Sequence, residues 1–141
     1  MSKRMTKDDV PRTAGVFKPV GHIVLVMQDA AAVARALAEL QRAGFEAADT
    51  IVYSSEEMIA QCEEDQRGAS MLASLGAEIN LSRKHMELAR RGHCFIVVFA
   101  PEDDQVQRVA NVAERTDALF AQRYGLLTVE ELVRPAESPR A

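Results

Sequence analysis

The chain has 141 residues, of which 48% are hydrophobic and 27% are charged, and its formal net charge is −4. These values predict one globular domain, and the acidic balance disfavours a nucleic-acid-binding protein. Two distant cysteines argue against a disulfide framework and favour a reducing cytoplasm, and no apolar run reaches the roughly 18 residues of a membrane span.

Residues 1–20 and 134–141 are predicted to be mobile tails on either side of a single domain, residues 21–133. Residues 1–12 of the N-terminal tail carry four basic residues but no apolar segment follows them, so the tail does not have the pattern of a secretory signal. The C-terminal tail combines prolines with charged residues, a composition typical of frayed chain ends.

The first predicted strand is His22–Gln28, a short apolar run. Asp29 is a candidate N-cap for a helix over Ala30–Ala43, in which apolar residues recur at helical spacing. Gly44 is expected to end this helix, because a left-handed conformation costs glycine little. The next strand, Asp49–Tyr53, is short and begins with polar residues, which favours a position at the edge of a sheet.

Two helices are predicted next. Ser54 and Glu57 have the spacing of a capping box at the start of the first, which runs to about Gln66. The second is a longer amphipathic helix over about 69–91, and Gly92 is expected to end it.

The most apolar run in the chain is the third predicted strand, His93–Ala100, which is expected to be buried on both faces. Cys94 within it is therefore predicted to be buried and inert. A helix with acidic residues in its first turn follows Pro101 and ends near Thr116. The fourth strand, Leu119–Tyr124, is more polar and is predicted to form the second edge of the sheet.

Two strand–helix–strand units, each opening with Gly-His, favour an α+β fold of the ferredoxin-like type. The expected element order is β-α-β-(α-α)-β-α-β, with a helical excursion between the second and third strands. The expected strand order is 4-1-3-2, with the first and third strands adjacent and antiparallel. A doubly wound parallel sheet is the alternative, since strands alternate with helices, and the edge-like second strand favours the ferredoxin-like sandwich.

Both faces of the two central strands are apolar in this arrangement. The crossover helices cover one face of a ferredoxin-like sheet, and monomers rarely expose an apolar patch as large as the other face would be. The amphipathic excursion is expected to cover that face only in part. A homodimer that packs through the second face is therefore predicted.

The three histidines do not predict a metal site. His22 and His93 begin antiparallel strands and are expected at opposite ends of the sheet, and no Cys or other His lies at metal-binding spacing from His85. Residues 28–30 lack the glycine-rich loop that approaches a phosphate. No metal and no cofactor are therefore assigned.

The strongest candidate for a ligand-binding site is Gln122, Arg123 and Tyr124, at the end of the fourth strand. Arg123 is suited to bidentate binding of an anion, although polar residues on a strand also protect a sheet edge against aggregation. Glu78 and His85 share one face of the long helix, and a carboxylate near an imidazole can perform acid–base chemistry. The more common role of such a pair is the polar border of an amphipathic helix.

Five segments of residues 21–132 form a recognisable set: Gly21-His22 with its strand, Tyr53–Met58, Gly76–Leu81, Ala121–Gly125 and Glu130–Leu132. They resemble segments of small proteobacterial proteins, which in turn resemble the ferredoxin-like domains of bacterial general stress proteins. The resemblance implies a cytoplasmic, stress-linked accessory role. It implies no settled activity, so no catalytic residue is transferred.

The sequence thus predicts a non-catalytic cytoplasmic domain that binds a small ligand or a protein, without a membrane partner. The alternative is a small enzyme that uses Arg123, His85 and Glu78 on an anionic substrate. An enzyme would require these side chains to converge in one concave site, which distinguishes the two hypotheses.

Overall fold

The computed structural model describes residues 12–13, 16–17, 21–60, 86–124 and 129–133. The strands of its main sheet are β3 (His22–Met27), β4 (Thr50–Tyr53), β5 (Cys94–Phe99), β6 (Phe120–Tyr124) and β7 (Val129–Val133). The helices are α1 (Ala30–Arg42), α4 (Asp103–Arg115) and the short 3-10 helix η1 (Ala47–Asp49), and residues 55–60 and 86–90 are also helical. Within the predicted N-terminal tail, β1 (Arg12–Thr13) and β2 (Val16–Phe17) pair as a small antiparallel ladder.

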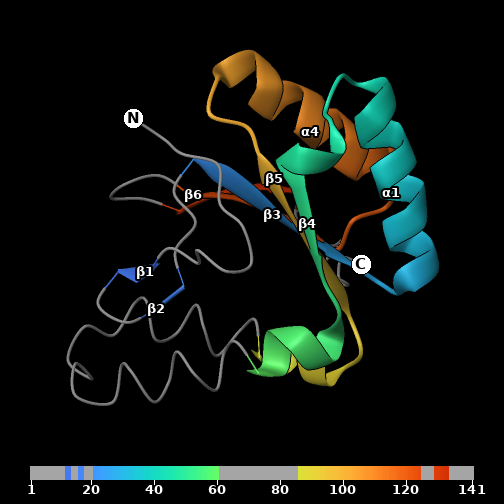
Figure 1. The fold of residues 1–141 in the computed structure, drawn as a ribbon, viewed down its shortest axis with the longest axis vertical. Coiled ribbons are helices and arrows are strands. Elements are labelled where there is room, and N and C mark those ends of the chain that lie inside the picture. The colour runs from blue at the N-terminus through green and yellow to red at the C-terminus, as the bar shows by residue number, and fades with distance from the viewer. Residues whose placement is uncertain (1–11, 14–15, 18–20, 61–85, 125–128, 134–141) are drawn as a thin grey trace, which may run out of the picture.

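The five strands of the main sheet lie in the order β4-β5-β3-β6-β7, and all neighbours are antiparallel. The fold is therefore α+β, and the alternative of a parallel sheet is wrong. The predicted antiparallel pairing of the two central strands is confirmed, with His22 opposite Phe99 and Met27 opposite Cys94. Figure 1 shows α1 and α4 side by side on one face of this sheet.

The fourth predicted strand is not an edge of the sheet. It corresponds to β6, and β7 pairs with it in an antiparallel arrangement that has a register shift between Ala121 and Gln122. The prediction of an edge position is wrong because one more strand, β7, follows in the chain and pairs with the outer side of β6. The second predicted strand corresponds to β4, which lies at the end of the sheet as expected.

Two apolar cores lie on opposite faces of the sheet, because side chains alternate along each strand. The first lies under α1 and α4 and includes Leu25, Ile96 and Val109. The second includes Val24, Phe95 and residues of both short helical segments. Both faces of the central strands, which were expected to be apolar, thus pack against a core.

The second face of the sheet is not open. Val24, Phe95 and Val97 at its centre are 0% exposed within a single chain. Met58 and Met86, from the two described helical segments of the excursion, pack in the same cluster. The expectation that the excursion would leave much of this face uncovered is therefore wrong, and the argument for a homodimer through it does not hold.

Local signals at the helix starts behave as predicted. The Asp29 carboxylate accepts a hydrogen bond from the Ala32 amide at 2.9 Å and caps α1. Ser54 and Glu57 form a reciprocal capping box, with the Glu57 amide donating to Ser54 Oγ at 3.1 Å and the Ser54 amide donating to Glu57 Oε1 at 2.9 Å. These bonds satisfy amides that have no partner within the first helical turn.

The ends of α1 and of residues 86–90 share one hydrogen-bond motif. After α1, the Phe45 amide donates to the Leu40 carbonyl and the Gly44 amide donates to the Gln41 carbonyl, which is a Schellman motif. Gly44 has a φ of 101° and Gly92, after residues 86–90, has a φ of 91°. Glycine tolerates this left-handed conformation because it has no Cβ atom.

Cys94 is half-buried, so the prediction of full burial is wrong. It is the first residue of β5, where the strand enters the sheet, whereas Ile96 and Val98 further along the strand are 0% exposed. In α4, Val106, Val109, Val112 and Ala113 are buried, and Ala110 is half-buried.

Among the described residues, no helix is long and apolar enough to cross a membrane. Cys62, most of the predicted helical excursion and the C-terminal tail 134–141 lie outside the described residues.

Candidate functional site

The three candidates on β6 do not lie together. Gln122 and Tyr124 are buried, 5% and 1% exposed, and the Tyr124 hydroxyl lies 3.4 Å from Gln122 Oε1, to which it donates. Arg123 points to the opposite face, because side chains alternate along a strand. There its guanidinium forms an ion pair at 3.1 Å with Asp103, in the first turn of α4. Only Arg123 is therefore accessible from outside.

Glu78 and His85, the candidates on the long helix, lie outside the described residues. The convergence of Glu78 and His85 with Arg123, which the enzyme hypothesis requires, stays a prediction.

The two strand histidines occupy opposite ends of the sheet, as expected. His22 is 2% exposed and its ring centroid lies 5.1 Å from that of Phe99. His93 Nδ1 lies 3.2 Å from the carbonyl oxygen of Gln28, at the other end of β3. Within the part of the chain that the structure describes, no group of three His, Cys, Asp or Glu residues is placed to hold a metal ion.

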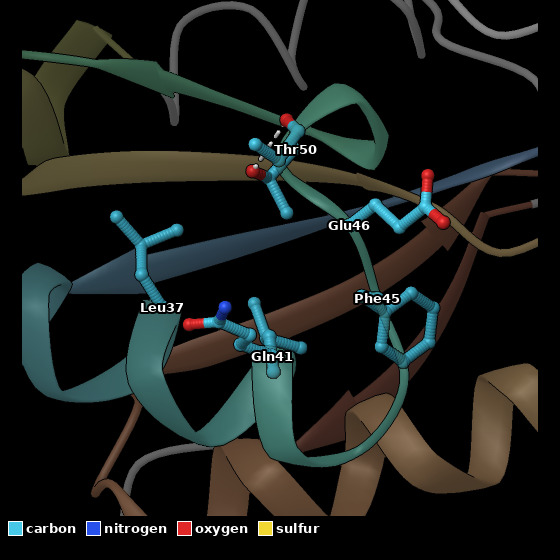
Figure 2. A pocket seen from close by; sticks show the side chains of 7 residues that line it. Leu37, Gln41, Phe45, Glu46 and Thr50 are labelled. Atoms are coloured by element: carbon cyan, nitrogen blue, oxygen red, sulfur yellow. Dashed lines mark hydrogen bonds between the residues drawn. The ribbon is translucent and has the colours of Figure 1, made fainter.

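A pocket of about 190 Å³ lies between α1 and the beginning of β4, as Figure 2 shows. Three apolar side chains, Leu37, Leu40 and Phe45, form much of its wall. The remaining lining is more polar and comes from Gln41, Glu46, Ala47 and Thr50.

The sequence builds this pocket through the sharp end of α1. The Schellman motif at Gly44 turns the chain back, and Phe45 becomes 5% exposed beside Leu40. An apolar contact between these two positions commonly accompanies the motif. The loop then rises to β4 through η1 and leaves a hollow beside Leu37, which is only half-buried.

The polar rim of the pocket is held by short-range hydrogen bonds. Glu46 and Asp49 cap η1 reciprocally, with the Glu46 amide donating to Asp49 Oδ2 at 2.9 Å. The Thr50 hydroxyl donates to the Ala47 carbonyl at 3.2 Å. These contacts fix the backbone of the rim, while the Glu46 residue remains exposed to solvent.

The size of the pocket limits what it can bind. Sites for drug-sized ligands and cofactors typically span roughly 300–1,000 Å³, whereas this pocket has about 190 Å³. It has room for one apolar side chain or a fragment of similar size. Its apolar wall and hydrogen-bonding rim are suited to holding and orienting such a group.

Comparison of the chain with protein-family models, with curated proteins and with solved structures found no match.

Sequence reasoning missed this pocket, although one signal was present. Phe45 is a large apolar residue directly after the glycine that ends α1 and directly before a polar loop. The Schellman motif explains its contact with Leu40, but the hollow depends on the distance between α1 and β4. That distance is set by the packing of the whole sheet and cannot be obtained from the sequence of the loop.

Proposed function

We propose that the protein is a non-catalytic binding domain, and that the pocket between α1 and β4 receives an apolar group of a small ligand or protein partner. The observation that carries this proposal is the pocket itself, with Leu37 and Phe45 in its wall and Thr50 at its rim. A preformed apolar hollow with a few polar groups is the usual form of a binding site.

The order of four strands supports a closer description of the scaffold as a ferredoxin-like sandwich. Strands β6, β3, β5 and β4 follow one another, with every neighbour antiparallel and with α1 and α4 over the same face. This is the order expected from two interleaved strand–helix–strand units, and β7 then extends the sheet by one strand. A cytoplasmic, stress-linked accessory role rests on the resemblance of residues 21–132 to general stress proteins.

The test uses ¹⁵N-labelled protein and N-acetyl-leucinamide, a capped amino acid with one apolar side chain. Millimolar additions are expected to shift the amide resonances of Leu37, Phe45 and Thr50, because these residues line the pocket. N-acetyl-glycinamide, which has no side chain, is the control probe and is expected to shift them much less.

A pair of variants locates the binding event. Gln41→Phe places an aromatic ring at an exposed pocket-lining position of α1 and is expected to abolish the shifts. Arg35→Phe introduces the same ring at an exposed position of α1 that does not line the pocket, and it should leave them intact. Shifts that persist in Gln41→Phe, or that never appear in the unmodified protein, would contradict the proposal.

A further inference from the structure

Strand β4 lies at one end of the main sheet. It pairs with β5, from Thr50 opposite Val98 to Tyr53 opposite Phe95. In the described part of the chain, no other strand pairs with its outer side. A strand in this position presents backbone groups with the spacing that another extended chain needs for pairing.

The pocket lies beside this edge, on the face of the sheet that α1 covers. Thr50 lines the pocket, and Val52, two residues further on the same strand, packs against the first core. Ile51 lies on the opposite face and packs against the second core. An extended segment that added to β4 would therefore place alternate side chains toward α1, and one of them could enter the hollow between Leu37 and Thr50.

Acidic residues flank the edge strand at both of its ends. Glu46 is exposed at the rim of the pocket before β4, and Glu56 is exposed in the helical residues that follow it. The whole chain has a net charge of −4. A basic segment is therefore favoured at this edge, because opposite charges across neighbouring strands stabilise pairing and like charges oppose it.

The same charges disfavour a second copy of the chain as the occupant. Two β4 strands that paired across a two-fold axis would be antiparallel, so the beginning of each would face the end of the other. Glu46 of one copy would then lie at the same end of the strand pair as Glu56 of the other copy, and the two carboxylates would repel each other.

We infer that β4 accepts an extended segment of a partner protein by strand addition, with one apolar side chain in the pocket and a Lys or Arg on either side of it. This inference rests on the proposed function, since it uses the same pocket. Main-chain hydrogen bonds would supply affinity, and the pocket with its acidic flanks would supply specificity.

The probe is a capped peptide, Lys-Val-Leu-Val-Lys, in which leucine and both lysines point to the same side when the chain is extended. Binding to the full chain is followed by NMR, and hydrogen exchange of β4 amides reports strand addition. Added peptide is expected to slow exchange in residues 50–53. Methylation of alternate peptide nitrogens removes backbone donors and is expected to weaken binding about tenfold or more.

Charge preference is tested with a matched pair of variants. Glu46→Lys reverses a charge at the pocket rim and is expected to weaken the basic peptide about two- to fivefold, the range for exposed ion pairs. Glu114→Lys makes the same change at an exposed position of α4 and should have no such effect. A glutamate-flanked version of the peptide should bind more weakly to the unmodified protein, and equal binding of the two peptides would overturn the preference for a basic segment.

The outcomes separate this inference from the proposed function. If N-acetyl-leucinamide binds but the methylated and parent peptides bind equally, strand addition is wrong while the pocket still binds apolar groups. If β4 amides gain protection when the protein alone is concentrated, the occupant is a second copy and the inference is wrong. If neither the peptide nor N-acetyl-leucinamide binds, both proposals fail.

Discussion

Asp117 is the only non-glycine residue in the described part of the chain with a positive φ, 57°. It occupies the position after the C-cap of α4, and the Ala118 amide donates to the Ala113 carbonyl as in a Schellman motif. Gly44 occupies the equivalent position after α1, and Gly92 occupies it after residues 86–90. At this position an L-side chain costs energy, and a carboxylate also opposes the helix dipole.

We therefore expect Asp117→Gly to raise the free energy of unfolding by about 0.5–1 kcal/mol, measured by urea denaturation. The control is Glu114→Gly, which removes the same charge from a helical position of α4. It should lower the free energy of unfolding by about 1 kcal/mol, because glycine is a poor helix former. If both variants lowered the free energy of unfolding equally, the left-handed conformation of Asp117 would carry no strain.

At the scale of single elements, the beginning of α1 depends on one side chain. Asp29 caps this helix through the Ala32 amide. We predict that Asp29→Ala lowers the free energy of unfolding by about 1 kcal/mol, the typical value of an N-cap. Gln28→Ala, at the exposed position one residue earlier, should leave stability unchanged. Identical denaturation curves for Asp29→Ala and the unmodified protein would argue against this role for the cap.

The helices and central strands could be predicted because local chemistry determines them. Asp29, the Ser54–Glu57 box and Gly44 act on backbone groups a few residues away, and the short unbroken apolar run of β5 is typical of a strand buried on both faces. Such signals do not depend on how the rest of the chain packs.

Features that arise between elements could not be predicted in the same way. Gln122 and Tyr124 were expected at an accessible edge, but β7 pairs with β6, and both side chains are buried. Two adjacent glutamates, Glu130 and Glu131, interrupt the apolar–polar alternation that would have indicated β7. The pocket likewise depends on the separation of α1 and β4, which no local pattern records.

At the scale of the whole molecule, stability depends on a sheet that is buried on both sides within one chain. Phe95 is 0% exposed at the centre of the second core. We predict that Phe95→Ala lowers the free energy of unfolding by about 3–5 kcal/mol, the usual cost of deleting a buried aromatic ring. Phe99→Ala, on the same strand at a half-buried position, should cost distinctly less.

The midpoint of thermal unfolding is expected to be independent of protein concentration for both the unmodified protein and Phe99→Ala, because the second face needs no partner subunit. Sedimentation equilibrium at micromolar concentration provides a direct check. A dimer mass, together with a midpoint that rises with concentration, would show that the second face is completed by another copy.

The interleaved order of the strands also has a consequence during synthesis on the ribosome. β3 lies between β5 and β6, and both of these strands follow it in the chain by most of the length of the domain. All six of its residues are buried in the finished sheet. While the nascent chain is still short, neither hydrogen-bonding neighbour of β3 has been translated. The apolar residues of β3 therefore stay unpaired and exposed, and exposed apolar segments are bound by chaperones and aggregate readily.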